Sequence, residues 1–222
     1  MKLIAALHGP GLPERLLSPA LRTELARAGA SRLQVNLDDA DVADAMRFGP
    51  GVPVTALLSV WDADVAAALD VVRRLDAGAA AWLVAERTPL SPPPVPDGER
   101  APALANVALL RRPASMTPEA WLGDWLERHT QVAIDTQATF GYLQHPVLEH
   151  LTESGRDVHG IVEELFDMAA MSDPHAFYGS RGDDAELQRR LGTLMDSCAR
   201  FGAADGLDLV PTSRYLFGLT TG

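Results

Sequence analysis

The segment RTPLSPPPVPDGERAP (residues 87–102) divides the sequence into two halves. Five of the residues from Pro89 to Pro96 are proline. Proline lacks a backbone N–H and fixes φ, so this segment is excluded from helices and central strands and is expected to be extended. We therefore predict an N-terminal module at residues 1–90, a proline-rich linker at 91–102 and a C-terminal module at 103–222.

The two halves show the same order of predicted elements. In the first half, apolar runs predict strands at 2–8, 30–37, 52–61 and 79–87, with helices at 12–29 and 62–78, the second capped by Asp62. In the second half, strands are predicted at 103–112, 138–148, 157–166 and 209–217, with a helix beginning after Thr117 and another at 185–202. Each half is βαββαβ, so the predicted fold class is α+β, with two tandem ferredoxin-like modules.

The strands of both halves are apolar on both sides of the pleat. VTALLSV (54–60) and ANVALL (105–110) do not alternate polar with apolar residues. A sheet with its helices on one face must bury the other face against something. Two such sheets facing each other within one chain would form a pseudo-twofold barrel, with the helices outside and a cavity between the sheets.

The composition narrows the classes of partner. Lys plus Arg is 19 and Asp plus Glu is 30, so the formal net charge is −11. This balance argues against nucleic acid and against an anionic membrane as a partner. The single cysteine, Cys198, is typical of a reducing compartment, and no apolar run approaches the length of a membrane span. We expect a soluble, cytoplasmic protein.

The segment AWLGDWLERHTQVAI (120–134) places one histidine on the apolar face of a predicted helix. At 100° per residue, an arc of about 140° holds Trp121, Val132, Trp125, His129, Leu122, Ala133 and Leu126, in that angular order. His129 is at its centre. It is either a core histidine bonded to the backbone, or it faces a pocket. In a pocket, a neutral imidazole with an unperturbed pKa near ~6.5 suits a general base.

Three segments of the second half carry a resemblance. LLRRPASMTPEAWLGDWLERHTQVA (109–133), FGYLQH (140–145) and PTSRYLF (211–217) resemble the EthD family of dimeric α/β barrels. The match is good over 107–146, fair over 205–217 and only architectural over 1–90, where the helix histidine is absent. The resemblance implies a ferredoxin-like barrel, usually formed by two chains and here by two halves of one. It also implies that His129 is a pocket residue, but it implies little about the reaction.

Two strands offer partners for His129. Tyr142 and Gln144 share one face of their predicted strand; if that face lines the barrel, the Tyr142 phenol could bind a carbonyl or enolate oxygen and Gln144 would contact the ligand. Otherwise, Tyr142 packs beneath the helices. Arg214 and Tyr215 lie on opposite faces of the last strand, so at most one points inward. An inward Arg214 would stabilise an enolate or bind a carboxylate, whereas an outward one is exposed to water.

Aromatic residues provide further candidates for ligand contact. Trp125 lies beside His129 on the helix face, although tryptophans on such faces usually pack in the core. SDPHAFYGSRGDD (172–184) is a turn-rich insert in which Phe177 and Tyr178 are unusual for a solvated loop. It could form a lid over the barrel mouth, a subunit contact or a local tuck.

The remaining motifs predict neither a metal nor a cofactor. His145, His150 and His159 lack the HxxxH or HExxH spacing of metal sites, and Cys198 has no evident histidine partner. No GxSxG, GxGxxG or P-loop motif is present.

These patterns lead to one functional hypothesis and its alternatives. A small apolar carbonyl-containing or phenolic molecule would bind in the barrel, and His129 would act as general base in a cofactor-independent isomerisation, cyclisation or dehydration, with Tyr142 or Arg214 stabilising the oxyanion. A noncatalytic protein, with a small-ligand-binding, stress or structural role, is the alternative from another class. A cofactor-free monooxygenase is a further possibility, and a homodimer is compatible with the sequence.

Overall fold

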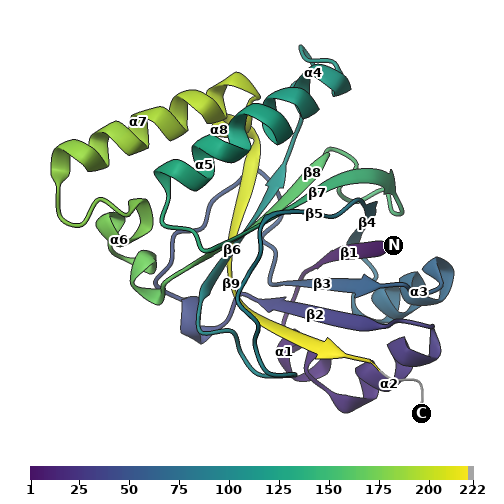
Figure 1. Cartoon of the computed structure of the whole chain (residues 1–222). Helices are drawn as coiled ribbons and strands as arrows, with labels where there is room; N and C mark the ends of the chain where they lie inside the picture. The colour runs from purple at the N-terminus through teal and green to yellow at the C-terminus, as the bar shows by residue number, and fades with distance from the viewer. Residues whose placement is uncertain (220–222) are drawn as a thin grey trace.

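The computed structural model describes residues 1–219, without the side chain of Asp205. In chain order the elements are β1 (Lys2–Leu7), α1 (Leu12–Leu16), α2 (Pro19–Arg27), β2 (Arg32–Leu37), η1 (Ala40–Val42), β3 (Ala56–Trp61), α3 (Val65–Leu75), β4 (Ala80–Val84), β5 (Arg87–Leu90), β6 (Leu104–Leu110), α4 (Pro118–Leu122), η2 (Gly123–His129), α5 (Thr130–Thr136), β7 (Gly141–His150), β8 (Gly160–Phe166), η3 (Met168–Met171), α6 (Pro174–Tyr178), α7 (Asp184–Arg200), α8 (Ala203–Gly206) and β9 (Leu207–Gly218). The longer helices form two groups on opposite sides of the strands (Figure 1).

Eight strands close into an antiparallel barrel. Their order is β4-β1-β3-β2-β9-β6-β8-β7, and pairing between β4 and β7 completes the ring, while β5 adds to the edge of β7. Two seams therefore join the halves of the chain, β2 with β9 and β4 with β7. When the four barrel strands of each half are numbered along the chain (β1 to β4, and β6 to β9), both halves show the same spatial order: fourth, first, third, second.

Capping residues set the helix boundaries in the first half. The helix predicted over 12–29 is two helices, because Ser18 adopts an extended backbone and caps α2, with Pro19 in its first turn. The N-cap predicted at Asp62 is wrong. Asp64 caps α3 by accepting from the Ala67 N–H, and Asp62 instead accepts from the Ser31 hydroxyl and the terminal amine.

The helix that carries His129 is wound differently from the α-helix assumed above. α4, η2 and α5 are continuous, and η2 is π-helical, a form that occurs often at functional sites. The four most buried positions of the predicted stripe are Trp121, Trp125, His129 and Ala133, spaced four residues apart, whereas Leu122, Leu126 and Val132 are only partly buried. Residues four apart lie near one face of the helix, so these four side chains point toward the same side.

Side chains fill the barrel interior, so the predicted cavity between the sheets is wrong. Apolar residues from both halves meet there, including Ile4, Trp82, Val107 and Ile161. The free space among them and their polar neighbours is only about 10 Å³. That volume is about the minimum for one water molecule and too small for an organic ligand.

The proline-rich segment packs against the barrel. Val95 contacts a cluster that includes Ala105, Leu143 and Leu165, and the Gly98 N–H donates to the Leu216 carbonyl. β5 lies at the start of this region, as an edge strand that tolerates Pro89. Within residues 1–219, none of the helices is both long and apolar enough to cross a membrane.

Candidate functional site

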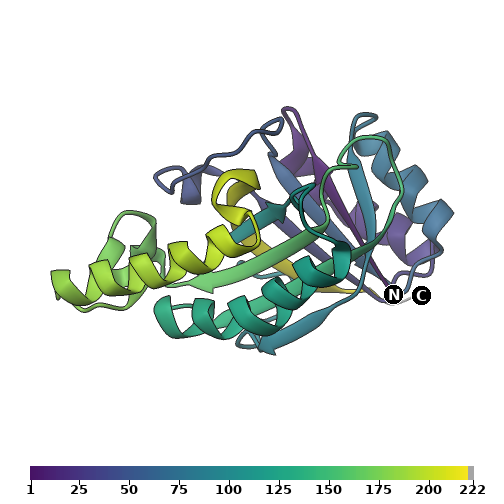
Figure 2. The same ribbon diagram turned by 90° about the horizontal axis from the view of Figure 1, so that it is seen from above.

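A cavity of about 360 Å³ lies outside the barrel, between the sheet of the second half and its covering helices. Its floor is formed by β6, β7, β8 and β9, and its walls by η2, α6 and α7. The helix that contains η2 and the long helix α7 lie over this sheet in Figure 2. Met46 and Phe48, from the loop before β3, form part of the rim and are exposed. Most of the lining is apolar, which is typical of small-molecule sites.

His129 lies in the wall of this cavity, where burial keeps the imidazole neutral. Its side chain is 7% exposed, and its ring is 4.7 Å from the Phe201 ring, centroid to centroid. Burial, with a smaller effect of the Arg200 charge, lowers the pKa of His129 from 6.5 to about 4. At neutral pH the ring is therefore uncharged.

Ser197 of α7 holds one ring nitrogen of His129. His129 Nδ1 is 3.0 Å from Ser197 Oγ, which also accepts from Arg200 Nη2 at 3.0 Å. Within residues 1–219, Nε2 makes no hydrogen bond. The hydroxyl can donate to Nδ1 or accept from it, so Ser197 can serve either neutral tautomer. When the Ser197 hydroxyl accepts from Nδ1–H, Nε2 is the unprotonated nitrogen, and its free lone pair can accept a proton.

The lowered pKa of His129 predicts acid sensitivity. Between pH 6.5 and 4 the unfolded chain binds a proton at His129 that the folded chain does not, so stability falls as the pH falls. Relative to His129→Gln, the wild type should lose about 3 kcal/mol across this interval. Urea unfolding of both proteins from pH 7 to 4 measures the difference, and parallel stability curves would contradict it.

A polar row crosses the cavity floor. Glu164 on β8 is paired in register with Asn106 on β6 and with Tyr142 on β7, and all three line the cavity. Desolvation raises the pKa of Glu164 from 4.5 to about 7, opposed by a hydrogen bond from Gln137. In the amide orientation that satisfies both groups, Gln137 donates to Glu164 Oε1 at 2.9 Å and to the Ala133 carbonyl at 3.1 Å.

Two atoms of this row are buried without hydrogen bonds. Neither the Tyr142 hydroxyl nor Asn106 Oδ1 has a partner within residues 1–219, and the same is true of Trp125 Nε1 in the wall. Burial raises the pKa of Tyr142 well above 10, so the phenol stays protonated. Buried polar atoms are normally paired, so these groups are candidates for binding a ligand.

Glu164 was missed in the sequence, although a signal was present. Two adjacent glutamates, Glu163 and Glu164, occur in the apolar strand GIVEELF (160–166). Adjacent strand residues point to opposite faces, so at least one carboxylate had to be buried or to line a site. Here Glu163 points into the barrel and Glu164 into the cavity.

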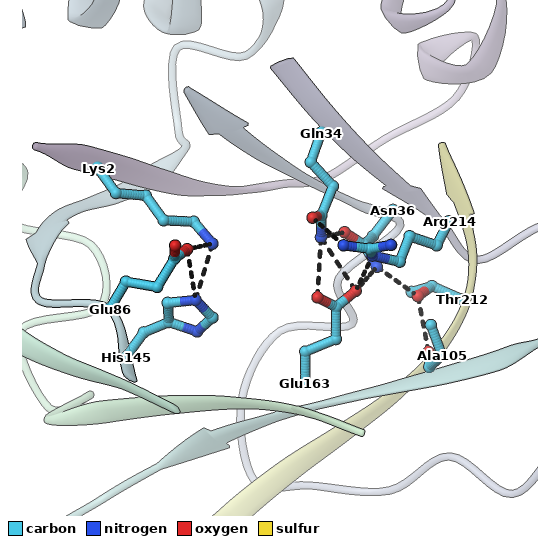
Figure 3. Close-up of polar contacts among 9 residues, drawn as sticks. All are labelled: Lys2, Gln34, Asn36, Glu86, Ala105, His145, Glu163, Thr212 and Arg214. Carbon is cyan, nitrogen blue, oxygen red and sulfur yellow. Dashed lines mark hydrogen bonds and ion pairs between the residues drawn. The ribbon is translucent and has the colours of Figure 1, made fainter. Parts of the chain in front are cut away.

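Arg214 does not meet His129. Of the two orientations considered for Arg214, the structure shows the inward one, but its side chain points into the filled barrel (Figure 3). Its Nε lies 3.2 Å from Glu163 Oε1, and Nη2 donates to Gln34 Oε1 at 2.9 Å. Burial alone would raise the pKa of Glu163. The Arg214 charge and a hydrogen bond from Asn36 outweigh this effect and lower the pKa. Arg214 therefore belongs to a buried ion pair at the β2–β9 seam.

A second polar cluster lies at the other seam. Lys2 Nζ is 2.9 Å from Glu86 Oε2 and 2.7 Å from His145 Nε2, beside the pairing of β4 with β7 (Figure 3). Burial lowers the pKa of Lys2, partly offset by the Glu86 charge. His145 contacts Lys2 and Glu86, whereas the rings of His150 and His159 lie 6.1 Å apart, centroid to centroid. Within residues 1–219, no three His, Cys, Asp or Glu side chains gather as a metal-binding set.

The other expected contact residues divide into two groups. Trp125, Phe177 and Tyr178 line the cavity, where Phe177 stacks on Phe166 with ring centroids 4.4 Å apart. The insert that carries Phe177 and Tyr178 contains the short helix α6. Gln144 shares the helix-facing side of β7 with Tyr142, but it is not part of the cavity lining and donates to Thr130 Oγ1 at 2.9 Å.

Comparison with known proteins identifies the fold but no family. No family model matches the sequence, and no curated protein matches it. A solved structure described as an anthrone oxidase-like protein has a TM-score of 0.54 and 10% identity, over 99% of this chain and 93% of that chain. A "putative monooxygenase" from Lactobacillus acidophilus NCFM has a TM-score of 0.48 and 9% identity, over 98% of this chain and 95% of that chain. The protein is therefore an α+β barrel similar in fold to the first of these.

Proposed function

We propose that the cavity binds a small, largely apolar molecule with a carbonyl or phenolic oxygen, and that His129 acts on it as general base. One observation carries the proposal: a neutral imidazole, held at Nδ1 by Ser197, lines an apolar cavity of about 360 Å³. At neutral pH this imidazole is uncharged, which is the protonation state that a general base requires.

The reaction class that fits this arrangement is a proton shift. His129 Nε2 takes a proton from the carbon next to a carbonyl, the C–H electron pair forms a C=C bond, and the carbonyl oxygen becomes an enolate oxygen. Return of the proton to a different carbon isomerises the molecule. If the enolate carbon instead attacks a second carbonyl carbon of the same molecule, a ring forms and the new alkoxide takes the proton from His129. If a hydroxyl group on the neighbouring carbon leaves, it takes that proton and departs as water, which is dehydration. The general base contributes typically about 10²–10⁴-fold to such a step.

We also infer that the halves are tandem ferredoxin-like modules, at residues 1–90 and 103–222 with the linker at 91–102, and that they are related to the EthD family. The equal strand order of the two half-barrels supports the first inference. The W…H helix at Trp125 and His129 supports the second. A homodimer remains compatible with this arrangement.

A ligand panel tests the proposed function. The panel contains phenols, lactones and anthrone, which is included because a protein of similar fold is described as anthrone oxidase-like. Calorimetry measures binding of each compound to the wild type, to His129→Phe and to Met195→Ala, a control at the rim of the cavity. We expect one compound class to bind the wild type and Met195→Ala, and to bind His129→Phe at least about tenfold more weakly because a hydrogen bond is lost. Equal binding to all three proteins would contradict a role for His129.

Product analysis separates the candidate reactions. Incubation of a bound compound with the protein in air and without oxygen, followed by mass spectrometry, distinguishes an isomer of equal mass from an oxygenated product. An unchanged compound in both conditions would favour the noncatalytic binding protein.

A further inference from the structure

The cavity floor contains two proton donors that no described residue uses. Tyr142 and Glu164 are direct cross-strand partners on β7 and β8, and both side chains project from the helix-facing side of the sheet. Side chains at such positions have Cβ atoms about 4.5–5.5 Å apart, so their polar ends can reach one common atom. We propose that Tyr142 and Glu164 together form an oxyanion-binding site that donates two hydrogen bonds to the ligand's carbonyl or phenolic oxygen.

The Tyr142 hydroxyl is available as a donor. Tyr142 is fully buried, and its hydroxyl has no hydrogen bond within residues 1–219. The Gln144 side chain is near enough to lower the pKa of the phenol, against the larger effect of burial. Gln144 Oε1 nevertheless also remains without a hydrogen bond within residues 1–219. A buried hydroxyl without a partner costs free energy, which a ligand oxygen at this position would recover.

Glu164 is available in its neutral form. The groups that face it are Gln137 by a hydrogen bond, and the Tyr142, Tyr178 and Cys198 side chains, whose pKa values its charge raises. All of these are uncharged at neutral pH, so no cation of the described part of the chain balances an ionised Glu164. Burial therefore keeps the carboxylic acid protonated below pH 7, where its O–H can donate.

A tyrosine beside a protonated carboxylic acid in an apolar site is an established arrangement for stabilising an enolate. Here it would complete the reaction proposed above, on which this inference rests. As His129 takes the carbon-bound proton, negative charge develops on the oxygen, and the two donors stabilise it. If Glu164 passes its proton to that oxygen, an enol forms, and Glu164 recovers the proton when the C=O bond is restored.

Binding of 4-nitrophenol at pH 6 tests this site, because the ionised and neutral forms of the probe absorb at different wavelengths. Affinity is measured by calorimetry, and the ionised fraction of the bound probe by its visible spectrum. The variants are Tyr142→Phe, Glu164→Leu and Glu164→Gln, which keeps a weaker N–H donor. Tyr215→Phe makes the same change as Tyr142→Phe at a phenol outside this cavity.

We expect Tyr142→Phe and Glu164→Leu to weaken binding by about 10- to 100-fold and to lower the ionised fraction of the bound probe, because each removes a hydrogen bond to a charged oxygen. Glu164→Gln should lie between them and the wild type, and Tyr215→Phe should match the wild type. If the wild type binds the probe and all four variants bind and ionise it equally well, the oxyanion site is refuted while the binding cavity stands. If the wild type itself does not bind, the proposed function fails with it.

Discussion

Replacing Arg214 with methionine is expected to destabilise the fold by about 3–5 kcal/mol. The substitution leaves the Glu163 carboxylate inside the barrel without its cation, although Gln34 and Asn36 still donate to it at 2.8–3.0 Å. Removing one partner of a buried ion pair costs more than removing both, because the remaining charge stays desolvated. Chemical unfolding at pH 7 measures the loss.

Two further proteins make this result specific. The double variant Arg214→Met with Glu163→Gln should recover most of the lost stability, since the remaining amide is neutral and can still bond to its neighbours. Arg128→Met removes an exposed arginine paired with Asp124 and should change stability by less than about 1 kcal/mol. A loss for Arg214→Met no greater than that for Arg128→Met would show that the interior pair does not hold the β2–β9 seam.

Glu164→Gln is expected to stabilise the protein by about 3 kcal/mol at pH 8. The pKa of Glu164 is about 7 in the folded chain and about 4.5 in the unfolded chain, so the folded chain holds a proton there that the unfolded chain releases. The stability from this difference is complete below pH 4.5 and is lost as the pH rises through 7. A neutral glutamine avoids the loss, so the gain should appear at pH 8 and vanish near pH 4.5.

The adjacent glutamate provides the matched control. Glu163→Gln makes the same substitution one residue earlier, on the opposite face of β8, where the pKa is lowered by Arg214 and Asn36. Removing that charge leaves Arg214 unpaired in the barrel, so Glu163→Gln should destabilise the protein at pH 8. Urea unfolding of both variants at pH 4.5 and 8 tests the opposite signs. The same sign for both at pH 8 would contradict the two environments described here.

The order of the elements could be predicted because the local signals were strong. The proline-rich segment marks the middle of the chain, and caps such as Thr117 with Pro118 mark helix starts. The break at Ser18 and Pro19 carries the same signal and could have been found in the sequence. The π-helical turn could not, because residues four apart also share one face of an ordinary α-helix, so Trp121, Trp125, His129 and Ala133 fit an α-helical stripe as well.

The location of the cavity could not be predicted, for a physical reason. Both faces of the strands are apolar, so alternation does not distinguish the barrel interior from the face beneath the helices. On β6, Val107 packs in the interior while Asn106 and Ala108 face the cavity. For the same reason, the sequence placed Tyr142 and Arg214 in one predicted site, although their side chains lie on opposite sides of the sheet.

The most direct test of the central proposal is an NMR titration of the His129 ring nitrogens, with and without a phenol from the panel that binds. We predict a ring that stays neutral down to a pKa of about 4, well below 6.5, and an Nε2 signal that moves when the phenol binds while Nδ1 keeps its bond to Ser197. A ring that titrates near 6.5, or an Nε2 signal that no bound compound moves, would contradict His129 as the base of this cavity.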